Sequence, residues 1–143
     1  MAIYDQNQLS VLINGYEIRD WASGADALKL AFNNAAGTLK MGSNGSGVFV
    51  ANNDRSATLT LKLKQHSADN KYLNGLRALQ DGNLKAFVPL TLEVRDLLNE
   101  DLISATKGYF TTRPEVTRGS EANDIQWVIV FERANVSLEQ GVA

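Results

Sequence analysis

The residue types that most often perform catalysis are sparse in this chain. It contains one histidine, His66, and no cysteine. A zinc site takes about four nitrogen, sulfur or oxygen ligands, so one imidazole does not make such a site. The lack of cysteine excludes a thiol nucleophile and a disulfide framework. We therefore interpret His66 as a polar residue at the end of a strand, and we expect no catalytic residue, no metal and no cofactor.

A glycine-rich segment at residues 42–47 reads Gly-Ser-Asn-Gly-Ser-Gly and superficially matches a phosphate-binding loop. It lacks the Lys-Ser/Thr pair that ends a P-loop. It is also followed by the strand-like run Val48, Phe49 and Val50 rather than by a helix. Its composition instead predicts the flexible tip of a hairpin.

Three acidic residues, Asp96, Glu100 and Asp101, lie close together in the sequence. Paired carboxylates can bind Ca²⁺ or act as a catalytic acid and base. Their spacing does not match a calcium-binding loop. We therefore interpret this segment as a solvated turn.

The two tryptophans have different surroundings in the sequence. Trp127 alternates with Ile125, Ile129 and Phe131, which places it on an apolar strand face and predicts a core position. Trp21 precedes a loop-like Ala-Ser-Gly segment. Because tryptophan is common both in cores and at interfaces, Trp21 either packs internally or anchors a partner.

Composition limits the class of protein. The chain has 143 residues, of which 44% are hydrophobic and 21% charged, with a formal net charge of -2. These values are typical of one globular domain, and they lack the basic excess of proteins that grip nucleic acid. The N-terminus shows no secretory signal pattern. The longest apolar run, residues 127–131, is too short to span a bilayer.

Alternation of apolar and polar residues dominates the chain and predicts strands. Asn14-Gly15 separates two alternating runs and favours a type I′ hairpin turn. The clearest half-buried strand covers residues 57–63, and the final long strand covers residues 124–138. Further strands are predicted at residues 28–32, 38–41, 88–94 and 103–110, the last with a bulge at Gly108.

One helix is predicted between these strand groups. Ser67 is a suitable N-cap for a helix over residues 68–80, and Gly82 is a suitable left-handed residue at its end. The sum is a mainly β fold with about seven or eight strands. We expect a β-sandwich or distorted barrel with one α-helix packed on its side, in a single domain over residues 1–143. An extended hairpin loop is expected at residues 42–54.

Three consecutive apolar residues, Val48, Phe49 and Val50, interrupt this otherwise polar loop. Apolar side chains in an exposed loop indicate a contact surface. We therefore expect them to pack against a neighbouring subunit or ring. Weaker candidates for such contacts are Trp21, Tyr4 and residues 136–143, because terminal segments are ordered mainly when they dock.

The order of these features resembles a known family. A strand pair at residues 27–41 and 55–65 is joined by the long excursion at residues 42–54. The second strand passes through His66 and Ser67 directly into the helix. This arrangement covers nearly the whole chain and resembles the tube proteins of contractile phage tails, which share a fold with the haemolysin-coregulated protein of type VI secretion.

The resemblance implies a structural virion protein rather than an enzyme. It implies hexameric rings that stack into a hollow tube, with the long hairpin reaching the adjacent ring. The implied partners are identical copies, the sheath protein, the baseplate and the tail terminator, without a membrane. Genome DNA would pass through the lumen during ejection without specific binding, and the virion tail would be assembled in the host cytoplasm.

The resemblance also implies a charge pattern. Lys29, Lys62 and Lys64 lie on polar strand faces. If these faces line the lumen, acidic residues such as Glu93 are expected nearby, because free cations would bind DNA phosphates.

Other functions remain open from the sequence. A tail terminator or a baseplate ring component would share the fold. A monomeric β-sandwich module that binds a ligand such as carbohydrate is disfavoured, because only 8% of residues are aromatic and most alternate on core faces. An unrecognised hydrolase is the most distant reading.

Overall fold

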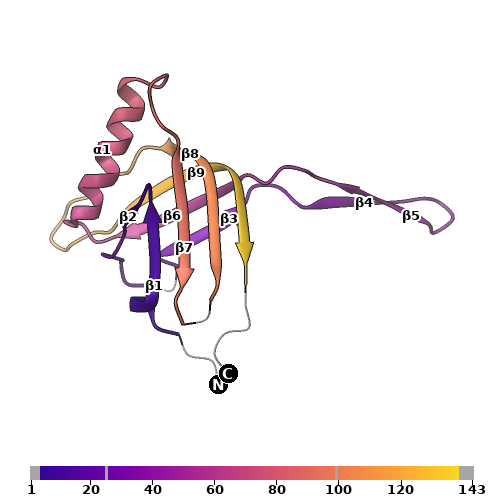
Figure 1. Cartoon of the computed structure of the whole chain (residues 1–143), viewed down its shortest axis with the longest axis horizontal. Coiled ribbons are helices and arrows are strands. Elements are labelled where there is room, and N and C mark those ends of the chain that lie inside the picture. The colour runs from indigo at the N-terminus through magenta and orange to yellow at the C-terminus, as the bar shows by residue number, and fades with distance from the viewer. Residues whose placement is uncertain (1–3, 25, 99, 139–143) are drawn as a thin grey trace.

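The computed structural model describes residues 4–24, 26–98 and 100–138 (Figure 1). Within these residues the structure has nine strands, one α-helix and a short 3-10 helix, η1. The elements in chain order are η1 (Gln6–Gln8), β1 (Leu9–Ile13), β2 (Tyr16–Glu17), β3 (Leu28–Phe32), β4 (Gly37–Met41), β5 (Gly47–Ala51), β6 (Ala57–Leu63), α1 (Ala68–Gly82), β7 (Leu90–Asp96), β8 (Leu102–Thr112) and β9 (Ile125–Ser137).

Seven strands form one antiparallel sheet in the order β2-β1-β7-β8-β9-β6-β3. The sheet is not closed, so β3 ends one side of it and the short β2 ends the other. Strands β4 and β5 pair only with each other and form an arm that projects from the body (Figure 1). The predicted fold class, mainly β with one helix, is therefore confirmed.

The Asn14-Gly15 hairpin forms as predicted. Both residues have positive φ, 52° and 85°, as a type I′ turn requires. The strand count exceeds the expected seven or eight because Val48, Phe49 and Val50 form strand β5 instead of lying in a loop. Valine and phenylalanine both favour the pleated conformation, and β4 supplies their backbone partners.

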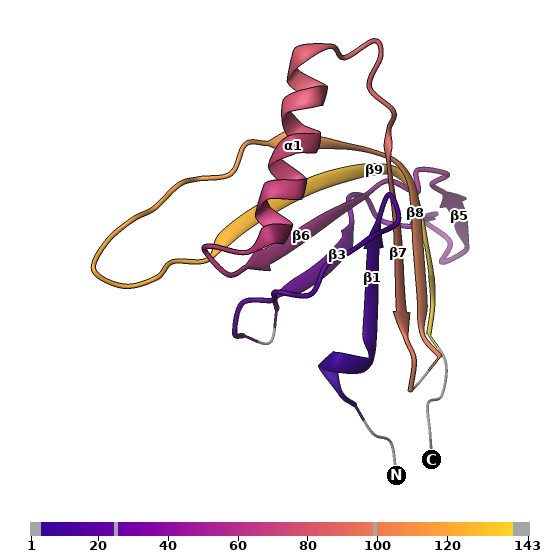
Figure 2. The same ribbon diagram turned by 60° about the vertical axis from the view of Figure 1, so that its left-hand side comes forward.

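Strands β8 and β9 are long and bend along their length, so each of them belongs to both halves of the curved sheet (Figure 2). A register shift between β7 and β8 places the bulge next to Lys107, whose φ is 57°. Gly108, where the bulge was expected, has a different role. A Cβ atom at Gly108 would lie 2.4 Å from the Phe131 ring, so only glycine leaves room for that ring to pack over β8 at this position.

The core lies between the inward faces of the curved sheet and helix α1. Every second residue of β6 and β7 is buried, which matches the alternation in the sequence. The largest fully buried side chains are Trp127, Phe131, Ile13, Ile18, Leu59, Leu61, Leu63, Leu73, Leu90, Ile129 and Val11. Trp127 is thus a core residue, as its strand position predicts.

Helix α1 begins at the predicted cap, because the Ser67 hydroxyl accepts a hydrogen bond from the Asp69 amide at 3.0 Å. Its end differs from the prediction. Gly82 is the last helical residue and does not take the left-handed conformation. Instead Asn83 ends the helix with φ of -153°, and its N–H donates to the Leu79 carbonyl at 3.1 Å. The helix thus ends at Asn83 without a glycine in the left-handed conformation.

Two specific contacts hold α1 on the side of the sheet. The Tyr72 ring stacks on Tyr16 with centroids 4.0 Å apart. The Gln80 amide donates to the Phe110 carbonyl and accepts from the Phe110 N–H, both at 2.9 Å. Gln80 therefore supplies β8 with the backbone partners that a neighbouring strand would otherwise provide.

A buried amide links the helix to two strands. The Asn70 side chain donates to the Lys64 carbonyl at 2.6 Å and to the Gln65 carbonyl at 3.3 Å. Its oxygen accepts a hydrogen bond from the Trp127 indole at 3.0 Å. Because one side chain joins the carbonyls after β6 to the buried indole N–H of β9, Asn70 fixes the helix start against both strands.

Asn70→Ala is expected to lower the free energy of unfolding by about 1–3 kcal/mol, because it leaves the buried Trp127 N–H without its partner. Chemical denaturation measures this loss. The matched control is Asn74→Ala on the exposed side of the same helix, for which we expect a change within about 0.5 kcal/mol. Equal effects of the two substitutions would show that the buried amide has no special role.

Candidate assembly surfaces

The arm carries an entirely apolar face. Register pairs Leu39 with Phe49 and Met41 with Gly47, so these side chains lie on one side of the hairpin. The Phe49 ring lies over Gly37, where a Cβ atom would be 2.3 Å from it. The Met41 sulfur covers Gly47 in the same way, at 2.6 Å. The two glycines thus let three large side chains form one continuous ridge.

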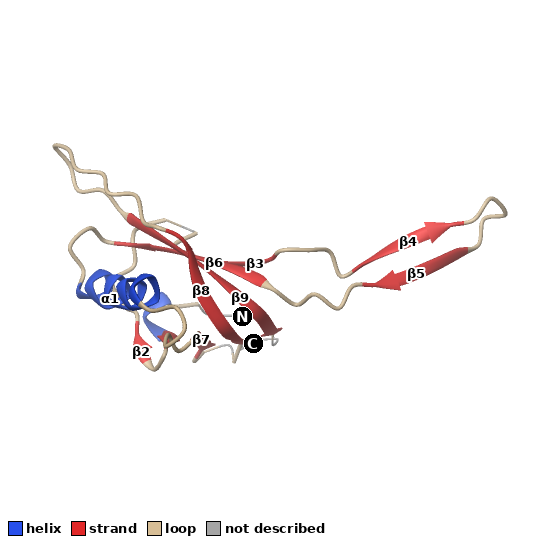
Figure 3. Ribbon diagram, turned by 90° about the horizontal axis from the view of Figure 1, so that it is seen from above, coloured by secondary structure: helices blue, strands red, loops and turns tan. Residues whose placement is uncertain are grey.

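The arm's apolar residues are exposed. Relative exposure is 67% for Val48, 62% for Phe49 and 50% for Val50, and Leu39 and Met41 are exposed to a similar degree. A two-stranded hairpin is marginally stable on its own in water. Val48, Phe49 and Val50 were predicted as contacts from the sequence, and Figure 3 shows the projecting arm on which they lie.

The arm's tip is a turn over residues 42–47. The Gly42 N–H donates to the Ser46 carbonyl at 2.6 Å, and Gly45 has φ of 86°. The Asn44 side chain accepts from the Ser46 N–H at 3.2 Å. The glycine-rich segment therefore closes a hairpin, in agreement with its composition.

Polar side chains form the neck that joins the arm to the sheet. The Asp54 carboxylate accepts from the Ser56 N–H at 2.9 Å and from the Asn34 amide. The Asn33 amide donates to the Ser56 hydroxyl at 3.0 Å, and the Thr58 hydroxyl donates to Asn33 at 2.6 Å. These bonds set the direction in which the arm leaves β3 and β6.

The pKa of the Asp54 carboxyl lies below its usual value, chiefly because the Ser56 backbone N–H donates to it, and further because the Ser56 and Asn34 side chains do so. A lowered folded-state pKa means that ionised Asp54 stabilises the neck above the unfolded pKa of about 3.9. This stabilisation is lost as the pH falls through the folded pKa.

We therefore expect the Ser56 amide to lose protection from hydrogen exchange only under acidic conditions below about pH 4. An NMR titration of the Asp54 carboxyl, with amide exchange followed in parallel, measures both quantities. Asp54→Asn should remove the pH dependence at Ser56. A measured pKa at or above about 3.9 would contradict the assigned hydrogen bonds.

The sheet has a free edge at β3. Lys62 donates to Ala27, and Asn33 donates to Ser56, so residues 27 and 33 face β6. Alternation then turns the backbone groups of Leu28, Leu30 and Phe32 to the other side, where no described strand pairs with them. A row of unpaired N–H and C=O groups is a template for a strand of another chain.

A cavity of about 250 Å³, lined mostly by apolar residues, opens between the start of β1 and the edge strand β3. We call this cavity the seam; Leu9 of β1 and Leu28 of β3 both line it, and Figure 2 shows these two strands. Its lining residues are Tyr4, Gln6, Leu9, Trp21, Gly24, Ala27 and Leu28. The seam exists because the sheet does not close, so the core reaches the surface there.

The structure divides the predicted contact residues into two groups. Val48, Phe49 and Val50 lie on the arm, whereas Tyr4 and Trp21 line the seam together. Tyr4 is 66% exposed, but Trp21 is only 9% exposed and forms a bridge with Leu63. Trp21 therefore packs internally and presents one side to the seam.

Of the C-terminal candidate segment, residues 136 and 137 belong to β9, Leu138 is exposed, and residues 139–143 lie outside the described residues. Sequence reasoning missed Leu39 and Met41 on the arm, and Leu9 and Leu28 at the seam. The spacing of Leu39 and Met41 from Gly37 was a usable signal, because alternation over residues 37–41 places all three on one face.

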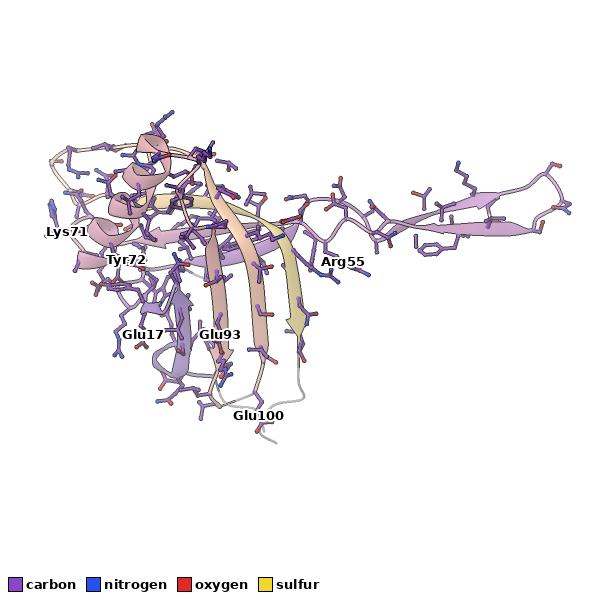
Figure 4. All side chains as sticks on the ribbon, turned by 45° about the horizontal axis from the view of Figure 1, so that its top comes forward. Glu17, Arg55, Lys71, Tyr72, Glu93 and Glu100 are labelled. Carbon is purple, nitrogen blue, oxygen red and sulfur yellow. The ribbon has the colours of Figure 1, made fainter. Side chains whose placement is uncertain are left out.

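Charges on the polar side of the sheet are paired locally. Lys62 pairs with Asp26 at 2.9 Å, which lowers the pKa of the Asp26 carboxyl. Glu93 pairs with Arg95 at 2.7 Å on the same strand. Figure 4 shows Glu93 on the body of the sheet, apart from Arg55 at the arm's root.

Of the other candidates for chemistry, His66 and Glu100 lie on surface turns. Asp96 is the last residue of β7 and is buried, so the expected solvated turn is wrong for this residue. His66 is exposed beside Gln65, and Glu100 lies at the far end of the β7–β8 turn (Figure 4). Asp96 accepts a hydrogen bond from the Leu98 N–H in that turn, at 3.1 Å. Among the described residues, no group of three or more His, Asp or Glu side chains is placed to hold a metal ion.

Over the part of the chain that the structure describes, no helix combines the length and apolar character needed to cross a bilayer.

Two solved structures share this fold. The cryo-EM structure of the anti-feeding prophage cap, a tube-terminating cap, matches with a TM-score of 0.61 and 12% identity over 96% of this chain and 93% of that chain. The sheath/tube terminator of an extracellular contractile injection system, PVC, in its extended state matches with a TM-score of 0.58 and 10% identity over 96% of this chain and 98% of that chain.

Sequence comparison is more specific. Among curated proteins, no sequence matches this chain significantly. The family model of the bacteriophage PhiTE tail tube protein matches residues 10–139, which covers all of the sheet except Leu9, the first residue of β1. The chain therefore belongs to the bacteriophage PhiTE tail tube protein family and is a structural protein of a phage tail.

Proposed function

We propose that six copies of this chain form a ring, that rings stack into the hollow inner tube of a contractile tail, and that the tube conducts DNA during genome ejection. The observation that carries this proposal is the open sheet, whose β3 edge has no partner among the described strands. An exposed sheet edge is an aggregation hazard that natural proteins cover. Pairing with identical copies covers it and forms a continuous wall.

The arm supports the same proposal. Its exposed apolar residues lie on strands with no other contact in the sheet. A heterologous contact between an arm and a different surface of another copy closes into a ring or continues as a stack. Both outcomes are needed to build a tube.

The charge distribution suits a DNA conduit. A channel wall with free cations would bind phosphates with salt-dependent affinity and slow the passage of DNA. The chain has a net charge of -2, and Lys62, Arg95 and Lys107 each have a carboxylate within 3.5 Å. Such exposed pairs add little stability, but they limit the positive charge that DNA would meet.

In this role the chain needs no active site, metal or cofactor. Its partners would be the sheath around the tube, the baseplate and terminator at the two ends, and the passing DNA. The protein would reside in the virion tail after assembly in the host cytoplasm.

A tail terminator is a second candidate function. It is favoured by the two solved structures, which are a tube-terminating cap and a sheath/tube terminator and match over nearly their whole lengths. A terminator ring would use the same edge contacts between copies but would stop growth instead of extending it.

Negative-stain imaging of the purified protein, combined with analytical ultracentrifugation, separates these functions. The tube function predicts hollow tubes whose length grows with protein concentration. The terminator function predicts single rings that never elongate. A chain that remains monomeric at every concentration would refute both.

A further inference from the structure

We propose that Asn44, at the tip of the arm, is a site of spontaneous covalent modification, where the side-chain amide is lost and the residue becomes aspartate or isoaspartate. This inference is independent of the assembly proposed above, because it concerns the chemistry of a single chain. It singles out one of three asparagines that precede a glycine in the sequence, in the pairs Asn14-Gly15, Asn44-Gly45 and Asn74-Gly75.

The reaction is intramolecular and needs only water as a co-reactant. The main-chain nitrogen of the glycine loses its proton to a solvent base and attacks Cγ of the asparagine side chain. The bond from Cγ to the side-chain nitrogen breaks, and that nitrogen takes a proton from water and leaves as ammonia. Water then adds to either carbonyl of the resulting succinimide ring and opens it to a carboxyl group. Glycine favours the attack because it has no Cβ atom to block the approach.

The fold decides which of the three pairs reacts, because their local sequence is the same. The asparagine backbone must rotate until the glycine nitrogen lies in contact with Cγ, at about 3–3.5 Å. Hydrogen bonds that hold the pair in another conformation must open first, so the rate depends on how easily each segment opens.

Asn14 is held by a strand inside the sheet. Its main-chain N–H donates to the Thr91 carbonyl at 3.1 Å. Its Oδ1 atom accepts from the Thr91 N–H at 2.8 Å and from the Thr91 hydroxyl at 3.3 Å. Thr91 belongs to β7, which lies between β1 and β8 and cannot move with the turn. Rotation of Asn14 therefore breaks three hydrogen bonds to a fixed partner.

Asn74 is held by helix α1. Asn74 and Gly75 lie in the middle of the helix, so their main-chain groups belong to its hydrogen-bond ladder. The Asn74 Oδ1 atom also accepts from the Arg77 guanidinium, at 2.8 and 3.2 Å, and Arg77 pairs in turn with Asp81. Attack by the Gly75 nitrogen therefore requires the helix to unwind locally.

Asn44 is held only by its own turn. The Gly45 N–H donates to the Gly42 carbonyl at 3.1 Å, and Asn44 Oδ1 accepts from the Ser46 N–H at 3.2 Å and the Ser46 hydroxyl at 2.7 Å. All of these residues are exposed at the far end of the arm (Figure 3), whose two strands pair with no other described strand. The tip can therefore open without disturbing the sheet or the helix.

The two products change the tip in different ways. Both add one negative charge. Aspartate keeps the path of the main chain, whereas isoaspartate directs the main chain through the side-chain carbonyl and adds one methylene carbon to it. The extra carbon lengthens the segment between Gly42 and Ser46, whose N–H and carbonyl close the turn at 2.6 Å. Isoaspartate at position 44 therefore opens the tip, and aged chains differ from new ones there.

Peptide mapping of the full-length chain tests this inference. The chain is incubated in mildly alkaline buffer, at a concentration at which it does not assemble. Trypsin then places the three asparagines in different peptides, because lysine or arginine residues separate them in the sequence. Mass spectrometry with fragmentation follows the exchange of amide for acid at each position. We expect Asn44 to react at least about tenfold faster than Asn14 or Asn74, which is the effect of about one hydrogen bond that must open first.

The same chain in guanidinium chloride is the matched control, because unfolding removes the protection of Asn14 and Asn74. We expect the three rates to converge there. Equal rates in the native chain, a faster reaction at Asn14 or Asn74, or an Asn44 that reacts only when the chain is unfolded would overturn the inference.

Asn44→Gln gives a second test. It keeps an amide at the tip but requires a six-membered ring, so the gain of acid in the arm peptide should disappear. A gain that persists would place the modification at another residue. Amide exchange at Gly42 should be faster in the isolated isoaspartate form than in Asn44→Asp, which has the same charge. Equal exchange in the two forms would contradict the opening of the tip.

Discussion

Phe49→Asp is expected to abolish tube growth while leaving the subunit folded. Phe49 is 62% exposed and lies on the arm, outside the core, so its replacement removes no internal packing of the body. At a contact between copies the new carboxylate would be buried without a partner, which costs at least about 2 kcal/mol at a central interface position. Sedimentation should show a critical concentration raised by at least about 30-fold.

Asn44→Asp is the matched control for this substitution. It adds the same charge to the same arm, but at the solvated tip turn rather than on the apolar face. We expect tube growth close to that of the wild type. Tubes of normal length in the Phe49→Asp variant, with an unchanged circular dichroism spectrum, would refute the assigned role of the arm.

Gly108→Val is expected to lower the stability of the fold by about 1–3 kcal/mol. Valine is intrinsically better than glycine in a strand by up to about 1 kcal/mol, so propensity alone predicts a gain. The Cβ atom would lie 2.4 Å from the fully buried Phe131 ring, which has no space to withdraw. Overpacking therefore outweighs propensity, and chemical denaturation should show the loss.

A double-mutant cycle with Phe131→Ala isolates this clash. Phe131→Ala alone should cost about 3–5 kcal/mol, because it leaves a cavity in the core. The double variant should be more stable than the sum predicts by about 1–3 kcal/mol. Gly75→Ala is the control, since a Cβ there meets nothing within 4 Å and should stabilise the helix by up to about 1 kcal/mol. Strict additivity of the two core substitutions would contradict the clash.

Local patterns predicted most of the elements, because their causes are local. Alternation placed Ala57–Leu63 as a half-buried strand, Asn14-Gly15 as a hairpin turn and Ser67 as a helix cap. Each depends on side chains within a few residues of one another. The order of strands in the sheet depends on contacts between distant residues, which alternation does not encode.

The errors have the same origin. The role of Gly108 depends on Phe131, which lies 23 positions later in the chain, so its lack of a side chain was interpreted as a bulge. Gly82 was expected to cap the helix, but Asn83 ends it instead. The sequence also did not indicate that Lys62 pairs with Asp26, which lies 36 positions earlier in the chain.

The candidate contact surfaces were predictable in part. Val48, Phe49 and Val50 stood out as apolar residues in a polar segment, and the structure places them on an exposed arm. The sequence left Trp21 undecided between core and interface. Trp21 borders both the core and the seam, because the seam is formed by segments around Leu9 and Leu28 that only the folded chain brings together.

A cryo-EM reconstruction of the assembled protein tests most directly whether identical copies complete one another's sheets. We predict that in the assembled wall the outward backbone groups of Leu28, Leu30 and Phe32 in every subunit are hydrogen-bonded to a strand of a neighbouring copy. An assembly in which the β3 edges of all subunits face solvent would contradict this account.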